Sequence, residues 1–392
     1  MNTAASDRAQ KLLSLEEQVV RLQALLEASR QVHSILSVDD VLARTAQVMV
    51  RELEIEGAVF LAPGSGDLMA SYGAPAPADS DRNSRFPLLS REGRILAELV
   101  VTPSGDGGLS FYEQDFIEGL VLQAAVALEN ATYHERDLQW ARVQQDLDAA
   151  RGIQRSLLPK SMPRIDGFSI AGRSSACYEV GGDYMDTVEL RDGTQLLIVA
   201  DVAGKGLASA IMAVSFRSAF RSLTSQPLSL VDMVNRAGQQ HWEEGVEARR
   251  RYVTAIFVRL DLEKGEIEVV NAGHNPALLV FPDGATAIVE ASGTPLGMLP
   301  EMQYSAETIA FPAGSRVLLY TDGITEVFHG DDEFGFDRLS ETFCGAATPD
   351  AEKILDTLWE TLVSYSMNAP QTDDMTAIAV CHLLPQQEIA LP

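Results

Sequence analysis

The chain has 392 residues, 46% of them hydrophobic, and a formal net charge of −26 at pH 7. This length and apolar content suffice for two domains with their own cores. The acidic charge disfavours binding to nucleic acid or to an anionic membrane, because no basic surface is present to attract phosphates. It lacks a membrane-length apolar run and a secretory signal, and Cys177, Cys344 and Cys381 are scattered, so we expect a cytoplasmic protein without disulfides.

The first segment carries leucine and valine at alternating three- and four-residue spacing, at Leu12, Leu15, Val19, Leu22 and Leu26. Such spacing keeps one apolar stripe in line along a helix, as in a coiled coil. An ordinary amphipathic helix packed on its own domain would show the same pattern. We predict a short dimeric coiled coil over residues 1–28.

Residues 29–132 mix helical and strand-like segments. A helix over about residues 41–53 precedes three strand-like runs, GAVFLA, DLMASYG and RILAELVVT, and a long helix follows from near Phe111. The pattern resembles GAF domains, which are small α/β sensor modules. The segment GAPAPADSDRNSR is shorter than the insert that caps the pocket of ligand-binding GAF domains. The resemblance therefore implies a regulatory or dimerising domain and leaves open whether it binds a ligand or a protein.

The long helix continues beyond this domain with apolar residues every seven positions, at Tyr133, Trp140 and Leu147. A seven-residue repeat favours pairing with a second helix, and Pro159 is expected to end the helix. We predict a coiled-coil linker over residues 133–160 that holds a homodimer together and carries a regulatory signal.

Residues 161–386 show a different pattern. Strand-like runs joined by tight turns alternate with groups of helices, from FSIAGRSS near the start to MTAIAVCHLL at the end. This order predicts an α+β sandwich of antiparallel sheets.

Aspartates follow or precede apolar strands at several places in this second region. They are Asp183 in GGDYMD, Asp201 in IVADVAGKG, Asp322 in VLLYTDGITE, and the pair Asp373 and Asp374 in QTDDMTAIAV. One such motif alone is usually a turn. Together they predict carboxylates gathered at one edge of the sandwich, the oxygen ligands that Mg²⁺ and Mn²⁺ prefer.

The series IQRSLLP, GGDYMD, DVAGKGLASAIM, NAGHNPALL, GTPLGMLP, YTDGITEVF, DEFGFDRL and TDDMTAIAV closely resembles the protein phosphatase 2C (PPM) superfamily. Its nearest branch is that of the bacterial sigma-factor regulators, the RsbU-like and stage-II-E phosphatases. The resemblance implies a PPM-type αββα sandwich and two divalent ions, Mn²⁺ or Mg²⁺, that activate water for in-line attack on phosphorus.

The resemblance also implies roles for particular residues. Asp201 bridges the two ions, and the Val202 carbonyl completes one shell. Asp322 and Asp373 hold the second ion, while Asp183 contributes directly or through water. Two further acids, Asp374 and Asp186, are less certain ligands and are expected to be structural or to support the ligands.

The sequence departs from the eukaryotic relatives in one important place. Those enzymes have a histidine two residues after the bridging aspartate, where this chain has Ala203. His274 in NAGHNP is a candidate substitute, although a structural role in a strand-turn element is the stronger interpretation. Lys205 either meets a phosphate or is a solvated turn residue.

The resemblance implies a metal-dependent protein serine/threonine phosphatase. Its expected substrate is a phosphorylated anti-anti-sigma protein with a STAS domain, under control of the GAF-like domain and of a linker that includes Tyr133, Trp140 and Leu147. The alternative is a non-catalytic scaffold that binds a partner through the same fold, which the complete set of acids disfavours.

Overall fold

The computed structural model describes residues 23, 26–32, 37–105, 108–367 and 369–385. The chain divides into two compact units, Met1–Gln144 and Gln145–Pro392. Most of the predicted coiled coil over residues 1–28 lies outside the described residues. None of the described helices is long and apolar enough to cross a membrane.

The first unit contains an antiparallel sheet with the strand order β2-β1-β4-β3. Helix α2 (Val38–Leu53) and the first part of α3 (Phe111–Leu157) bury apolar side chains in the same core as this sheet. The strands are β1 (Gly57–Leu61), β2 (Leu68–Gly73), β3 (Ser84–Leu89) and β4 (Ile95–Thr102). Three of these strands confirm the predicted runs, and β3 was not predicted.

Helix α3 confirms the predicted long helix, since it begins at Phe111 and ends two residues before Pro159. Its first part is apolar on one side and is buried in the core of the first unit, for example at Ile117 and Leu120. Every residue from 135 to 146 is exposed, and the side chain of Trp140 is 66% exposed. The predicted linker thus carries large apolar groups that the described chain does not cover.

The second unit contains two antiparallel sheets, with the orders β11-β10-β13-β16-β5 and β12-β9-β8-β7-β6. The strands of the first sheet are β5 (Phe168–Ser175), β10 (Ala277–Val280), β11 (Thr286–Val289), β13 (Arg316–Tyr320) and β16 (Met375–His382). Those of the second are β6 (Tyr184–Glu189), β7 (Gln195–Val202), β8 (Val253–Asp261), β9 (Glu266–Ala272) and β12 (Glu307–Ala310). The predicted α+β fold with antiparallel sheets is confirmed.

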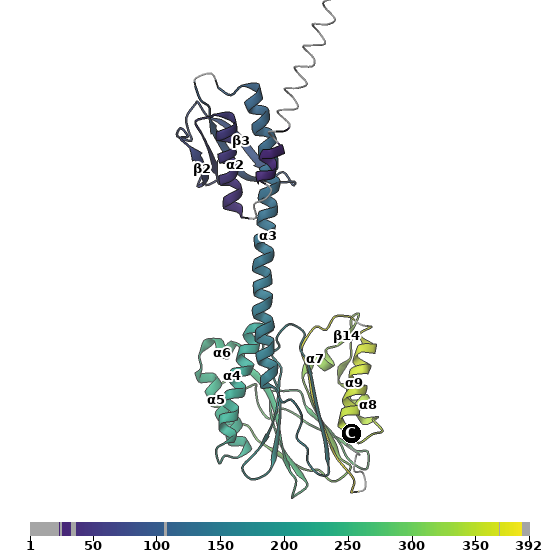
Figure 1. Ribbon diagram of the computed structural model, residues 1–392. Coiled ribbons are helices and arrows are strands. Elements are labelled where there is room, and N and C mark those ends of the chain that lie inside the picture. Colours follow the sequence, from purple (N-terminus) through teal and green to yellow (C-terminus); the bar gives the residue numbers. More distant parts are fainter. Residues whose placement is uncertain (1–22, 24–25, 33–36, 106–107, 368, 386–392) are drawn as a thin grey trace, which may run out of the picture. The chain divides into compact units, whose positions relative to one another are not determined.

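Helices cover the two sheets of this unit on opposite sides, with α4, α5 and α6 on one side and α7, α8 and α9 on the other (Figure 1). Side chains from both sheets, including Val199 and Ile378, form a further core between them. The helices are α4 (Leu207–Thr224), α5 (Leu230–Glu243), α6 (Val246–Arg250), α7 (Asp322–Thr325), α8 (Gly335–Cys344) and α9 (Ala351–Tyr365). A small hairpin, β14 (Phe328–His329) and β15 (Asp332–Glu333), precedes α8.

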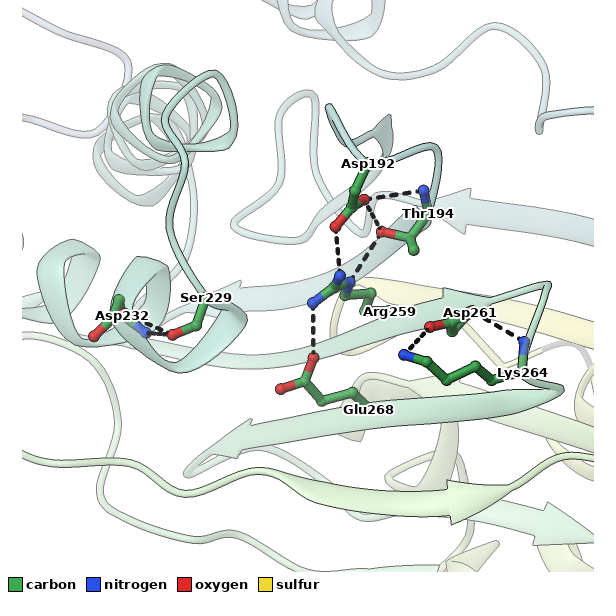
Figure 2. Close-up of polar contacts among 8 residues, drawn as sticks. All are labelled: Asp192, Thr194, Ser229, Asp232, Arg259, Asp261, Lys264 and Glu268. Carbon is green, nitrogen blue, oxygen red and sulfur yellow. Dashed lines mark hydrogen bonds and ion pairs between the residues drawn. The ribbon is translucent and has the colours of Figure 1, made fainter.

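Arg259 on β8 ties three segments together at one end of the second sheet (Figure 2). Its guanidinium donates to Asp192 at 2.5 Å and to Thr194 at 2.9 Å, and it pairs with Glu268 on β9 at 3.2 Å. Asp192 and Thr194 lie in the turn that leads into β7. Because Asp201 lies near the other end of β7, this cluster helps to fix the strand that carries the central candidate ligand.

Candidate metal centre

Asp201 lies near the end of a strand that is buried over most of its length, β7. The residues of β7 from Leu196 to Ala200 are fully buried, and Asp201 follows them directly. Burial, and then the negative charges of Asp322 and Asp373, raise the pKa of the Asp201 carboxyl to about 7. Carboxylates far apart in the sequence therefore share one site, as the strand-end pattern predicts.

Asp183 lies in the turn before β6, and it is only 6% exposed. Burial, followed by the charge of Asp201, raises the pKa of its carboxyl well above the usual range. The hydroxyl of Thr321 donates a hydrogen bond to Asp183 Oδ2 at 2.8 Å. Thr321 was not singled out in the sequence, although it directly precedes Asp322 in YTDG.

Asp322 and Asp373 lie near Asp201 and near each other. Asp322 is the first residue of α7, directly after the loop that ends β13, and burial and then the charge of Asp373 raise its pKa. Asp373 Oδ2 lies 2.7 Å from Lys205 Nζ, which also donates to the Thr372 carbonyl at 2.8 Å. Lys205 therefore neutralises part of the site, and its side chain remains 49% exposed.

Glycines allow the chain segments of the site to approach one another closely. A Cβ atom on Gly182 would lie 2.9 Å from the Val202 carbonyl oxygen and 3.2 Å from Asp201 Oδ1. A Cβ atom on Gly323 would overlap the backbone of Asp374. Only glycine fits at these two positions without displacing the acids or the backbone beside them, which explains the glycines in GGDYMD and YTDG.

Two further aspartates accept hydrogen bonds from other groups of the protein. The carboxylate of Asp374 accepts the backbone N–H groups of Cys177 and Gly182, each at 2.7 Å. Asp186 is fully buried and accepts two hydrogen bonds from Arg221, at 2.6 and 2.7 Å, and one from the hydroxyl of Tyr184 at 2.5 Å. These contacts suit carboxylates that hold backbone and helices in place.

The remaining acids suit hard divalent ions that keep part of their hydration. Among the described residues, no three side chains of His, Cys, Asp or Glu lie so that they could hold one metal ion directly. Mg²⁺ commonly binds through one or two carboxylates and several waters, which this wider spacing of acids permits. The carboxylates of Asp183, Asp201 and Asp322 are repelled by neighbouring acids, Asp373 among them, and a bound cation would relieve this repulsion.

His274 belongs to the interior of the fold. It is 6% exposed, its Nδ1 lies 2.8 Å from Thr254 Oγ1, and its backbone N–H donates to Asn271 Oδ1 at 2.8 Å. Burial lowers its pKa to about 3, so the ring is neutral at physiological pH. A neutral, buried imidazole is a poor general acid, which favours the structural interpretation of NAGHNP.

Replacing His274 by glutamine is expected to change how stability depends on pH. An unfolded histidine takes up a proton below pH 6.5, whereas His274 in the folded chain does so only near pH 3. The free energy of unfolding therefore falls as the pH decreases from 6.5, by up to about 4 kcal/mol, and this loss is absent in the variant. Urea unfolding at pH 7, 5.5 and 4 measures the difference between the two proteins. A difference that stays constant with pH would contradict this prediction.

Comparison with known families agrees with the motif series. Residues 191–383 match the family Stage II sporulation protein E (SpoIIE). This part of the chain is a SpoIIE-family domain of the PP2C type. The resemblance inferred from the motifs is thereby confirmed for this part of the chain. The family match does not extend into the first unit, where the GAF-like resemblance remains a prediction.

Curated relatives of the SpoIIE-family domain include two proteins named as phosphoserine phosphatases from Bacillus subtilis. The chain is 29% identical to RsbP over 183 residues (46% of this chain, 45% of RsbP). It is 23% identical to RsbU over 306 residues (75% of this chain, 85% of RsbU). It is also 26% identical to Protein IcfG of Synechocystis over 263 residues (60% of this chain, 41% of IcfG). The matched part thus spans less than half the length of RsbP and of IcfG.

Solved structures share the fold of the SpoIIE-family domain. The RsbU and RsbW domains of a Mycobacterium tuberculosis protein align with a TM-score of 0.51 at 26% identity, over 59% of this chain and 64% of that chain. The SiaA-PP2C domain of Pseudomonas aeruginosa aligns with a TM-score of 0.53 at 21% identity, over 62% of this chain and 97% of that chain.

Proposed function

We propose that this chain is a metal-dependent protein serine/threonine phosphatase. The observation that carries the proposal is the meeting of Asp183, Asp201, Asp322 and Asp373, from four separate segments, at one site of a SpoIIE-family domain. The names of RsbP and RsbU as phosphoserine phosphatases support the same activity.

Two divalent ions, Mn²⁺ or Mg²⁺, would supply activated water and neutralise the phosphoryl oxygens. Asp201 and the Val202 carbonyl, which lie close together beside Gly182, would hold these ions. Asp322 and Asp373 would also hold an ion, and Asp183 would contribute directly or through water. Asp374 keeps the adjoining backbone in place.

The chain's own residues also limit how the leaving group is protonated. Ala203 has no proton to give, and His274 is neutral and buried. We therefore assign protonation of the serine oxygen to water. Lys205 is half-exposed and paired with Asp373. If a bound ion neutralised Asp373, the Lys205 ammonium group would be free to bind a phosphoryl oxygen.

The proposed substrate is a phosphoserine or phosphothreonine on an anti-anti-sigma protein with a STAS domain. This choice follows from the branch of relatives to which the domain is similar. Control is assigned to the first unit and to a homodimer formed along α3, in which Tyr133, Trp140 and Leu147 face the second copy.

The proposal is tested by phosphate release from a phosphoserine STAS-domain protein in the presence of Mn²⁺. We expect release that stops when EDTA is added, and little release from a matched phosphotyrosine peptide. A protein that binds Mn²⁺ and the STAS partner but releases no phosphate would instead support the scaffold alternative.

Polar substitution of the seven-residue apolar repeat of α3, which includes Trp140 and Leu147, is expected to weaken the proposed dimer. Trp140→Glu together with Leu147→Glu removes two large apolar groups from the pairing surface, which should raise the dissociation constant at least about 100-fold. Analytical ultracentrifugation of the full chain measures this change. Ala141→Glu with Gln145→Glu adds the same charge at exposed positions on the opposite side of the helix and serves as the control. Unchanged dimerisation and activity in the first variant would contradict the role of α3.

A further inference from the structure

The turn that carries Asp183 is fixed on one side by strands of the second unit. The N–H of Gly182 donates to Asp374 Oδ2 at 2.7 Å, and the Gly182 carbonyl accepts the N–H of Val202 at 3.3 Å. These contacts hold Gly182 between the end of β7 and the start of β16. The backbone of the preceding residue, Gly181, is bound by a different part of the chain.

Gln154, one turn before the end of α3, holds Gly181 by both of its backbone polar groups. Its side-chain Nε2 donates to the Gly181 carbonyl at 2.7 Å, and its Oε1 accepts the Gly181 N–H at 3.3 Å. A glutamine side chain has both a donor and an acceptor, whereas glutamate could only accept and leucine could do neither. The contact therefore depends on this residue type.

A cleft of about 210 Å³ lies between the end of α3 and the turn. Arg151, Arg155 and Leu158 line it on the helix side, and Asp183 and Asp374 line it on the other. The paired hydrogen bonds of Gln154 connect the helix directly to the turn at this cleft. A small displacement of α3 would act on Gly181, two residues before Asp183.

We propose that Gln154 is the positioning residue through which α3 sets Asp183 in place for metal binding. The inference rests on the proposed function only in taking Asp183 as a metal-site residue. When the hydrogen bonds to Gly181 are lost, the turn relaxes and the site binds its ions less tightly. Turnover at saturating metal is unchanged, since Gln154 does not touch the reacting atoms.

The test compares the full-length wild type with Gln154→Leu and Gln154→Glu. The matched control is Gln145→Leu, which changes an exposed glutamine of the same helix. Mn²⁺ affinity is measured by calorimetry without substrate, and the Mn²⁺ concentration for half-maximal phosphate release is measured separately. Loss of two backbone hydrogen bonds should weaken Mn²⁺ binding about tenfold in Gln154→Leu. Gln154→Glu should show a smaller effect, and the control none.

Other outcomes separate this inference from the proposed function. Weaker Mn²⁺ binding in Gln154→Leu, with no phosphate release even by the wild type, would uphold the positioning role and overturn the phosphatase. Wild-type Mn²⁺ affinity in Gln154→Leu would overturn the positioning role. So would a variant whose turnover and melting temperature fall together while its Mn²⁺ affinity stays the same, because that result describes a merely structural residue.

Discussion

Replacing Asp201 by asparagine is expected to abolish phosphate release and to leave a folded protein that resists unfolding better than the wild type when no metal is present. Asp201 is the central ligand of the proposed two-metal site. The variant therefore loses several kcal/mol of transition-state stabilisation, or at least about 1,000-fold in rate. In the metal-free protein, the same change removes a buried charge that Asp322 and Asp373 repel.

The stability gain of Asp201→Asn has a definite pH dependence. The carboxyl loses its proton near pH 3.8 when unfolded but only near pH 7 when folded, so the metal-free wild type loses stability as the pH rises between these values. At pH 8 the variant should be more stable by on the order of 3 kcal/mol, and at pH 4 the two should be similar. Chemical unfolding in EDTA measures this difference, with Asp331→Asn at an exposed aspartate as the control. Retention of activity within tenfold would contradict the central role of Asp201.

Asp186→Asn is expected to have the opposite combination of effects, a large loss of stability with unchanged metal binding. Its carboxylate is fully buried and is the partner of Arg221 on α4 and of the Tyr184 hydroxyl. Removing the buried member of such a pair commonly costs 3–5 kcal/mol, and because Arg221 is 41% exposed and can turn to water, we expect about 3 kcal/mol.

Thermal and urea unfolding of Asp186→Asn, with Mn²⁺ affinity measured by calorimetry, check this expectation. The double variant with Arg221→Met should lose less stability than the sum of the two single changes, because the two residues share one interaction. An Asp186→Asn protein of wild-type stability that no longer binds Mn²⁺ would show that Asp186 is a metal ligand.

The main site was predictable because its signals are local. Asp201 and Asp322 follow apolar runs in the sequence, and Asp373 and Asp374 precede one. In antiparallel pairing the end of one strand lies beside the start of its neighbour, as at β13 and β16. The glycines beside Asp201 and Asp322 also signal close approach of the backbone. Together these features indicated which acids meet, although no spacing in the sequence states how far apart the carboxylates lie.

Other features depend on contacts between distant residues and carry no local signal. Asp373 and Asp374 are adjacent and chemically identical, and only the fold shows that the second accepts two backbone N–H groups while the first faces Lys205. Gln154 belongs to the motif IQRSLLP, but only the fold shows that its side chain contacts Gly181. Strand β3 was missed because it contains Pro87, which an edge strand tolerates.

The exposed stretch of α3 has a consequence for how the protein is cut. Residues 136 to 146 are all exposed within the described chain, and an isolated helix of that length is only marginally stable in water. Transient unwinding there would admit a protease at Arg136 or Arg142, whereas a second helix lying along Trp140 would suppress it. Limited digestion with trypsin would therefore report on the association state of the chain, and dilution alone should be enough to expose the cleavage sites.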